Sequence, residues 1–113
     1  VNADPEQVRR IFNNLIKNAI QAIPENKQGK IEVHLIGLKK TIKISVKDNG
    51  TGILKANFDK VFVPNFSTKN SGMGLGLAIC RKITETSNGS ISFISEPNKG
   101  TTFTVNLPRI ENN

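Results

Sequence analysis

The spacing of apolar residues predicts two long helices and one short helix. From Val8 to Ile23 apolar residues recur at helical spacing, so one face of this segment is expected to pack on a core. Asp4 is placed to cap this helix, and Pro24 is placed to end it. A second long helix is expected from about Gly74 to Ser87, closed by Asn88-Gly89, and a short one over Leu54–Lys60. Residues 63–72 have no period and are rich in turn formers, which predicts a mobile loop.

Alternation of apolar and polar residues predicts four strands in two hairpins. The order of these elements predicts an α+β fold of two layers. In this α/β sandwich about three helices cover one face of a mixed, mostly antiparallel sheet. We expect one domain over residues 1–108 and a flexible tail over 109–113. The predicted strands are Lys30–Gly37, Thr41–Lys47, Ser90–Ser95 and Thr101–Leu107.

Two asparagines interrupt the first helix. Asn14 and Asn18 lie four positions apart, so both carboxamides are on one stripe of the helix. Asparagine is a poor helix former because its side chain competes for the backbone. An exposed polar edge explains the pair. So does an oxygen-rich site for Mg²⁺, a cation that keeps waters and takes phosphate ligands.

The second strand ends in an acidic residue on its buried face. Ile42, Ile44 and Val46 share that face by the period of two, and Asp48 continues the parity. A buried carboxylate is costly unless it meets a hydrogen-bond donor, and an exocyclic amine such as adenine N6 would serve. Gly50 and Gly52 would let the backbone approach a flat ring closely. A plain Asp-Asn-Gly turn accounts for the same residues.

Three alternating glycines open the second long helix. Gly72, Gly74 and Gly76 would expose successive backbone N–H groups at the positive end of the helix dipole, which suits phosphate. The spacing is neither the dinucleotide-binding fingerprint nor a P-loop, because no strand leads directly into it and no Gly-Lys-Ser/Thr is present.

Composition adds little to these motifs. The net charge is +7, but the basic residues are spread along the chain and Trp and Tyr are absent, so a basic nucleic-acid binder is disfavoured. Cys80, the single cysteine, lies in an apolar helical pattern and is expected to be a small buried hydrophobe. No segment is long and apolar enough for a membrane helix.

Four segments in order resemble the motifs of the ATPase superfamily shared by gyrase B, Hsp90, histidine kinases and MutL. The third segment is similar to the F box, a trait of the histidine kinases, and details of the first look closest to their nitrogen-regulation branch. The resemblance implies a Bergerat-type ATP-binding fold. The segments are Asn14–Ala19 (N box), Asp48–Ile53 (first glycine box), Val61–Lys69 (F box) and Gly72–Leu77 (second glycine box).

The resemblance also implies roles for individual residues. Asn18 would coordinate Mg²⁺, with Asn14 and Lys17 near the phosphates of ATP. Asp48 would accept a hydrogen bond from the adenine amine, with Gly50, Gly52 and Thr102 close to the base. An ATP lid would span Pro64 to Gly72, and Phe62 and Phe66 would anchor this lid or pack where it meets the phosphoacceptor domain. The remaining implied phosphate contacts are Lys69, Gly72, Gly74, Leu75 and Gly76.

The mechanism follows from the residue at position 14. Hydrolysing members of the superfamily tend to carry a Glu there as the base for water, and a carboxamide cannot accept that proton. The chain is therefore expected to orient Mg·ATP and present its γ-phosphate in line to a histidine on a separate dimerisation and phosphoacceptor domain. His34, the single histidine, lies on the strand face opposite Val33 and Leu35 and is expected to be an ordinary solvent-side residue.

Two alternatives stay open beside the histidine kinase. One is a serine kinase of the anti-sigma-factor type in the same superfamily, against which the F box and Asn14 speak. The other is a docking module that has lost ATP, against which Asn18, Asp48 and the glycines speak. We expect a monomeric fragment in the cytoplasm, with a response regulator as an indirect partner. The sequence leaves open whether the parent protein is anchored in the inner membrane.

Overall fold

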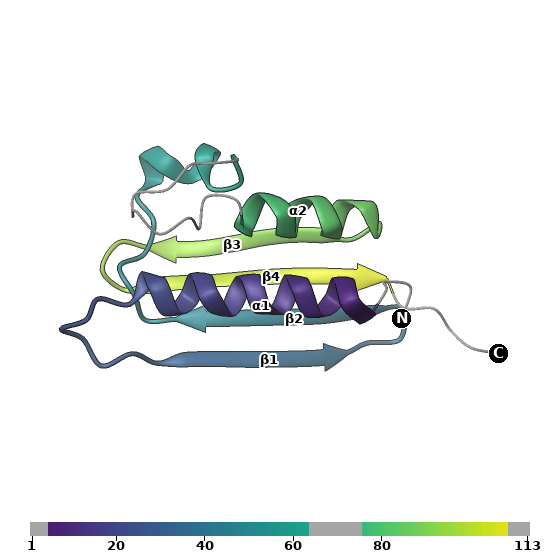
Figure 1. The fold of residues 1–113 in the computed structure, drawn as a ribbon, viewed down its shortest axis with the longest axis horizontal. Coiled ribbons are helices and arrows are strands. Elements are labelled where there is room, and N and C mark those ends of the chain that lie inside the picture. The colour runs from purple at the N-terminus through teal and green to yellow at the C-terminus, as the bar shows by residue number, and fades with distance from the viewer. Residues whose placement is uncertain (1–4, 64–75, 109–113) are drawn as a thin grey trace.

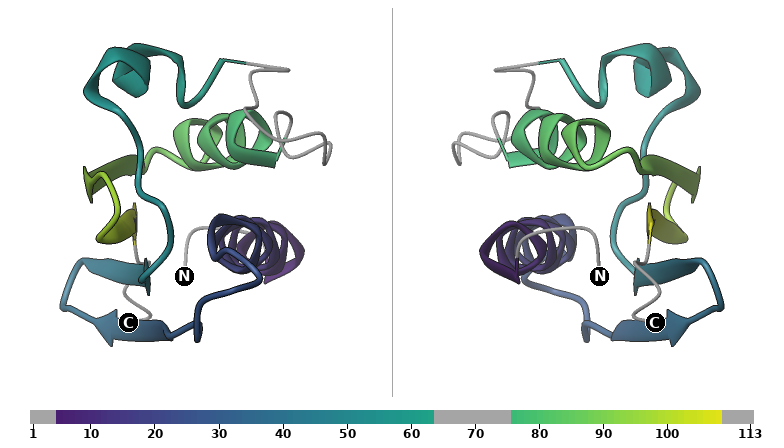
Figure 2. Two further views of the ribbon diagram at one scale, coloured as in Figure 1. Left: turned by 90° about the vertical axis from the view of Figure 1, so that its left-hand side faces the viewer. Right: turned by 90° about the vertical axis from the view of Figure 1, so that its right-hand side faces the viewer.

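The computed structural model describes residues 5–63 and 76–108, which form two layers (Figures 1 and 2). Helices α1 (Pro5–Ala22) and α2 (Gly76–Thr86) lie on one face of a four-stranded sheet. The short helix η1 (Lys55–Lys60), a 3-10 helix, lies beyond the β3 edge. The α+β sandwich predicted from the sequence is confirmed, and the third helix is the short one. The predicted mobile loop over residues 63–72 falls, beyond Val63, outside the described residues.

The sheet consists of two hairpins joined side by side. Its strand order is β1-β2-β4-β3, and all three pairings between described strands are antiparallel, so the sheet described here is not mixed. The join lies between β2 and β4, where Val46 is opposite Phe103 and Asp48 is opposite Thr101. The strands are β1 (Ile31–Gly37), β2 (Thr41–Asp48), β3 (Ser90–Glu96) and β4 (Gly100–Pro108).

The core lies between the helices and the inner face of β2 and β4. Along β4 buried and half-buried residues alternate strictly, which is the pattern expected of a strand with one covered face. On α1 the buried residues are Ile11, Leu15 and Ala19, whereas Phe12, which the helical pattern also assigned to the core, is exposed. The two helices approach closely where the Cys80 thiol on α2 donates to the carbonyl of Ile11, at 3.7 Å. The core side chains include Ile11, Leu15, Ile44, Val46, Phe103, Val105 and Leu107.

Both predicted ends of the long helices agree with the structure. Helix α1 ends at Ala22, shortly before Pro24. Helix α2 ends at Thr86, and Asn88 adopts a left-handed backbone (φ 63°) directly before Gly89, whose N–H donates to the carbonyl of Thr84 at 2.9 Å. The start predicted for α2, at Gly74, lies outside the described residues.

Candidate functional site

Asp48 is the acidic residue at the centre of the candidate site. It ends β2 on the covered face and is 3% exposed, as the alternation predicted. Its carboxylate accepts a hydrogen bond from the Gly50 N–H at 2.8 Å and another from the backbone of Thr101. Burial raises the pKa of this carboxyl, while the two hydrogen bonds and the charge of Lys27 act in the opposite direction. A carboxylate has more acceptor positions than these two bonds use, so Asp48 can accept a further donor.

The threonine beside Asp48 is Thr101. It lies directly opposite Asp48 in the pairing of β2 with β4 and is 4% exposed. Thr102, which the resemblance placed near the base, pairs with Lys47 and points to the other face of the sheet. The structure therefore does not bring Thr102 to Asp48. Phe103, Val105 and Leu107 are every second residue of the strand, and their apolar side chains already indicated its covered face. Thr101 lies two residues before Phe103, so the same alternation would have placed Thr101 on that face.

Ser95 joins the loop after Asp48 to the second hairpin. Its hydroxyl oxygen accepts from the N–H of Ile53 at 2.7 Å and lies 2.8 Å from the hydroxyl oxygen of Thr101. The same hydroxyl is 3.1 Å from the carbonyl oxygen of Gly100, to which it can donate. Sequence reasoning missed Ser95. The parity of Ile91 and Phe93 puts Ser95 on the covered face, but no local pattern indicates its contacts with Ile53 and Thr101.

Gly50 and Gly52 are required by the packing of the loop on the chain itself. A Cβ on Gly50 would collide with the last turn of α1 at Ala22, and the next residue, Thr51, donates its N–H to the Ala22 carbonyl at 2.9 Å. Gly52 has a φ of 73°, and a Cβ there would collide with the carbonyl of Glu96. The predicted close approach is present, and its partner in the structure is backbone. The loop is thus held between α1 and the β3–β4 turn.

The polar stripe of α1 comes close to the start of α2 at Asn14. Asn14 and Asn18 are half-buried and Lys17 is exposed. The Asn14 carboxamide oxygen would lie 3.7 Å from a Cβ placed on Gly76, the first residue of α2. Within residues 5–63 and 76–108 neither carboxamide has a hydrogen-bond partner. Lys69, Gly72, Gly74 and Leu75, the other predicted phosphate contacts, lie outside the described residues.

The donor set around Asn18 fits Mg²⁺ only in combination with a phosphate ligand. In the described part of the chain no group of three or more His, Cys, Asp or Glu side chains is placed to hold a metal ion. Carboxamide oxygens are suitable ligands for Mg²⁺, which usually keeps several waters and binds substrate phosphates. Asn18 can therefore supply one oxygen to the ion, and a nucleotide would have to supply the others.

Phe62 packs the chain against the sheet just after η1 ends. Its ring packs against Phe93 and Phe103, with ring centroids 5.9 and 6.2 Å away, and the guanidinium of Arg81 lies 5.4 Å from its centroid. The lid that the resemblance implied Phe62 to anchor lies outside the described residues, so that role stays a prediction. Phe66 lies outside the described residues.

The remaining single residues behave as the sequence predicted. Cys80 is fully buried, and burial raises the pKa of its thiol to about 12. His34 is exposed on the edge strand β1, opposite Ser45. Among the described helices, none combines the length and the apolar character that spanning a bilayer requires.

Comparison with known proteins identifies the fold and the family. Residues 3–111 match the family described as histidine kinase-, DNA gyrase B-, and HSP90-like ATPase. The chain belongs to this family. The catalytic domain of the histidine kinase ThkA superposes with a TM-score of 0.80 and 37% identity, over 94% of this chain and 68% of that one.

Within this ATPase family the chain is a catalytic domain of the histidine kinase type. It is 43% identical over 108 residues to the sensor histidine kinase ZraS of Escherichia coli K12, covering 96% of this chain and 23% of that protein. It is 34% identical over 109 residues to sporulation kinase A of Bacillus subtilis, covering 96% of this chain and 18% of that protein. The chain thus spans less than a quarter of the length of these relatives.

Proposed function

We propose that this chain binds Mg·ATP between α1 and the Asp48 end of the sheet and presents the γ-phosphate to a histidine on a separate domain. The observation that carries the proposal is the buried carboxylate of Asp48, which retains acceptor capacity at the edge of the core. The N6 amine of adenine is a donor of the required kind, and Asp48 would accept from it. Family membership supports ATP as the nucleotide.

The phosphates would lie along the polar stripe of α1. The loop after Asp48 is bonded to Ala22, one turn beyond Asn18, so a nucleotide with its base at Asp48 would extend its phosphates along α1 toward Asn18 and Asn14. Asn18 would hold Mg²⁺, which supplies charge neutralisation at the phosphates. Lys17 would add a positive charge, and Gly76 leaves room beside Asn14 at the N-terminus of α2.

The chain's own residues would orient the nucleotide, and the nucleophile would come from the partner domain. Asn14 has no proton-accepting group for activating water, so the site favours transfer to an incoming nitrogen over hydrolysis. Alignment and electrostatic stabilisation would then account for most of the rate. The partner would be the histidine-bearing domain of a longer kinase in the cytoplasm, which would pass the phosphate to a response regulator.

Calorimetric titration of the chain with a non-hydrolysable ATP analogue and its guanine counterpart, with and without Mg²⁺, tests this proposal. We expect adenine-selective binding that Asp48→Ala abolishes and a metal dependence that Asn18→Ala removes. Thr101→Val and Thr102→Val form a matched pair, because only the first removes a hydroxyl of the cluster beside Asp48, the one 2.8 Å from the Ser95 hydroxyl oxygen, and only the first should weaken binding. A folded chain that binds no adenine nucleotide, or fast ATP hydrolysis that Asn14→Ala abolishes, would contradict the proposal.

A further inference from the structure

Asn49 joins the connection between α1 and β1, residues 23–30, to the end of β2. Its side-chain oxygen accepts from the N–H of Lys30 at 2.8 Å, and its side-chain nitrogen donates to the carbonyl of Gln28 at 3.1 Å. Its backbone N–H donates to the carbonyl of Lys30 at 3.2 Å. A single residue of the turn after Asp48 therefore makes three hydrogen bonds to a segment that is 19 to 21 positions away along the chain.

The connection is held at both of its ends by the same turn. Before the connection begins, the carbonyl of Ala22 accepts from the N–H of Thr51 at 2.9 Å, and near its end lie the contacts with Asn49. Within it, the N–H of Lys27 donates to the carbonyl of Pro24 at 3.1 Å. The connection is thus a closed loop whose position relative to the end of β2 depends on Asn49.

The connection carries a cation that acts on the carboxylate of Asp48. The charge of Lys27 lowers the pKa of Asp48, against the larger effect of burial, which raises it. Lys27 is exposed, so water and salt screen its charge and the effect depends on its staying close. Within residues 5–63 and 76–108 Lys27 forms no ion pair, and Glu25 of the same connection has no effect of this kind on Asp48.

The other charged groups around this end of the sheet are paired or turned away. Lys47, which precedes Asp48 on β2, lies on the opposite face of the sheet. Two further cations, one at the start of β1 and one in the turn between β3 and β4, form ion pairs at 3.3 Å. These pairs are Lys30–Glu32 and Lys99–Glu96.

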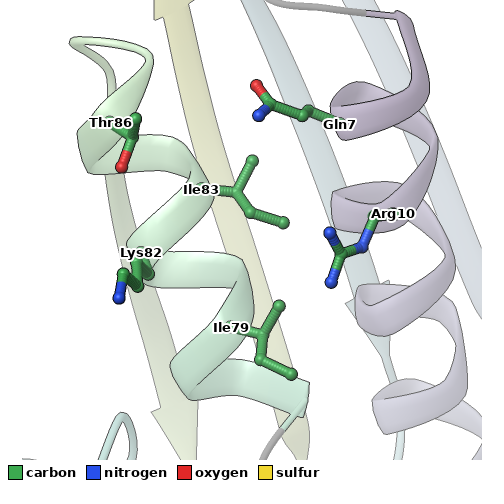
Figure 3. A pocket seen from close by; sticks show the side chains of 6 residues that line it. All are labelled: Gln7, Arg10, Ile79, Lys82, Ile83 and Thr86. Atoms are coloured by element: carbon green, nitrogen blue, oxygen red, sulfur yellow. The ribbon is translucent and has the colours of Figure 1, made fainter.

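The cations between the two long helices lie far from Asp48. Arg10 and Lys82 line a pocket of about 310 Å³ between α1 and α2 (Figure 3). Arg10 comes about three turns before Ala22, where α1 meets the turn after Asp48. Among the cations that the structure describes, Lys27 is therefore the one whose charge reaches the Asp48 carboxylate.

We propose that Asn49 is a positioning residue of the nucleotide site, which keeps Lys27 within electrostatic reach of Asp48 and so holds that carboxylate in the charged form. The proposal rests on the proposed function, since it concerns the same acceptor for the adenine amine. A protonated carboxyl is a weaker acceptor than a carboxylate, and burial favours the protonated form. The contacts of Asn49 act against this effect of burial.

The pH dependence of nucleotide affinity tests this inference. Calorimetric titration with a non-hydrolysable ATP analogue at about pH 4.5 and about pH 8, each variant relative to the wild type, cancels the titration of the nucleotide itself. Asn49→Ala and Lys27→Gln should each weaken binding roughly threefold more at the lower pH, where only part of Asp48 is ionised. The double variant should show no larger pH effect than Asn49→Ala, because both changes remove the same interaction.

Lys30→Gln is the matched control for the charge change. It removes one positive charge from the same connection, but that charge is paired with Glu32, and the backbone groups that contact Asn49 remain. Its affinity relative to the wild type should be the same at both pH values. A pH effect as large as that of Lys27→Gln would overturn the inference, because any nearby cation would then serve.

The remaining outcomes separate this inference from the proposed function. An equal loss of affinity at both pH values in Asn49→Ala, or a wild-type profile for Lys27→Gln, overturns the positioning role while nucleotide binding stands. Hydrogen exchange of the wild-type chain checks the contact without a variant, since the Lys30 amide that donates to Asn49 should exchange slowly. Exchange of that amide at the rate of an unstructured chain overturns the inference as well. Absence of adenine binding by the wild-type chain refutes the proposed function and this inference with it.

Discussion

Asp48 and Thr101 lie opposite each other at the ends of β2 and β4, and both are buried. The backbone of Thr101 donates to the Asp48 carboxylate, and its hydroxyl oxygen lies 2.8 Å from that of Ser95. One residue from each hairpin therefore contributes to the same polar cluster.

Ser95→Ala should destabilise the fold and weaken nucleotide binding together. The substitution leaves the N–H of Ile53 without its acceptor and Thr101 without its partner, which should lower the free energy of unfolding by about 1–2 kcal/mol. Urea denaturation measures the first effect, and calorimetry measures the second. Ser92→Ala on the same strand is the matched control, because Ser92 is exposed. Equal stability of the two variants would show that the Ser95 hydroxyl does not hold the loop.

Gly52→Ala and Gly76→Ala should separate folding from binding. Gly52 has a positive φ and no room for a Cβ, so its substitution should cost roughly 2–4 kcal/mol of stability. A Cβ on Gly76 would make only an ordinary contact with Asn14, its nearest atom being at 3.7 Å. Gly76→Ala should therefore keep the stability of the wild type and lower the affinity for ATP. Thermal unfolding of Gly52→Ala at the wild-type temperature would rule out this account.

Asp48→Asn should gain stability relative to the wild type as the pH rises. Burial raises the pKa of Asp48 from its ordinary 3.8. A carboxyl with a raised folded-state pKa contributes stability that is fully present below its unfolded pKa and is lost as the pH rises through the folded pKa. Asparagine does not titrate, so the variant lacks this loss. Urea denaturation between about pH 3 and pH 7 measures the difference, with Asp59→Asn on η1, an exposed carboxyl, as control. If the free energy of unfolding of Asp48→Asn minus that of the wild type stays constant or falls as the pH rises, burial is not the dominant effect on the pKa of Asp48.

Cys80 should react with a thiol reagent only when the chain opens. With a pKa of about 12, the thiol has about a thousandfold less thiolate near pH 8 than an ordinary cysteine, and the side chain is fully buried. Labelling with a chromogenic disulfide should therefore be slow in water and accelerate with urea in step with unfolding. The fully denatured chain gives the reference rate. Rapid labelling of the native chain would mean that α2 separates from α1 at Ile11 without unfolding.

The parts of the site that follow from local periodicity could be predicted from the sequence. Asp48 was placed on the covered face by the alternation of Ile44 and Val46 alone, and the structure agrees. Asn14 and Asn18 were placed on one stripe of a helix that exists as predicted. Each inference needs only the repeat of side-chain directions within a single strand or helix.

The parts that depend on the pairing of distant segments could not be predicted. Local parity places Thr101 and not Thr102 on the covered face, but the register that sets Thr101 directly opposite Asp48 is stated by no local pattern. Ser95 gained its role from Ile53 and Thr101, both brought to it by the fold. Gly52 was predicted to allow the approach of a ring, and its neighbour in the structure is the carbonyl of Glu96.

The join between the two hairpins has a consequence for folding kinetics. Each hairpin pairs segments that are close along the chain, whereas β2 and β4 must meet across all of η1 and α2. Contacts of long sequence separation form slowly, because the intervening chain must be ordered first. Asp48 and Thr101 terminate that late pairing. In a refolding experiment, a fluorescent ATP analogue should therefore bind in the slowest phase, after most helical signal has returned, and report completion of the sheet.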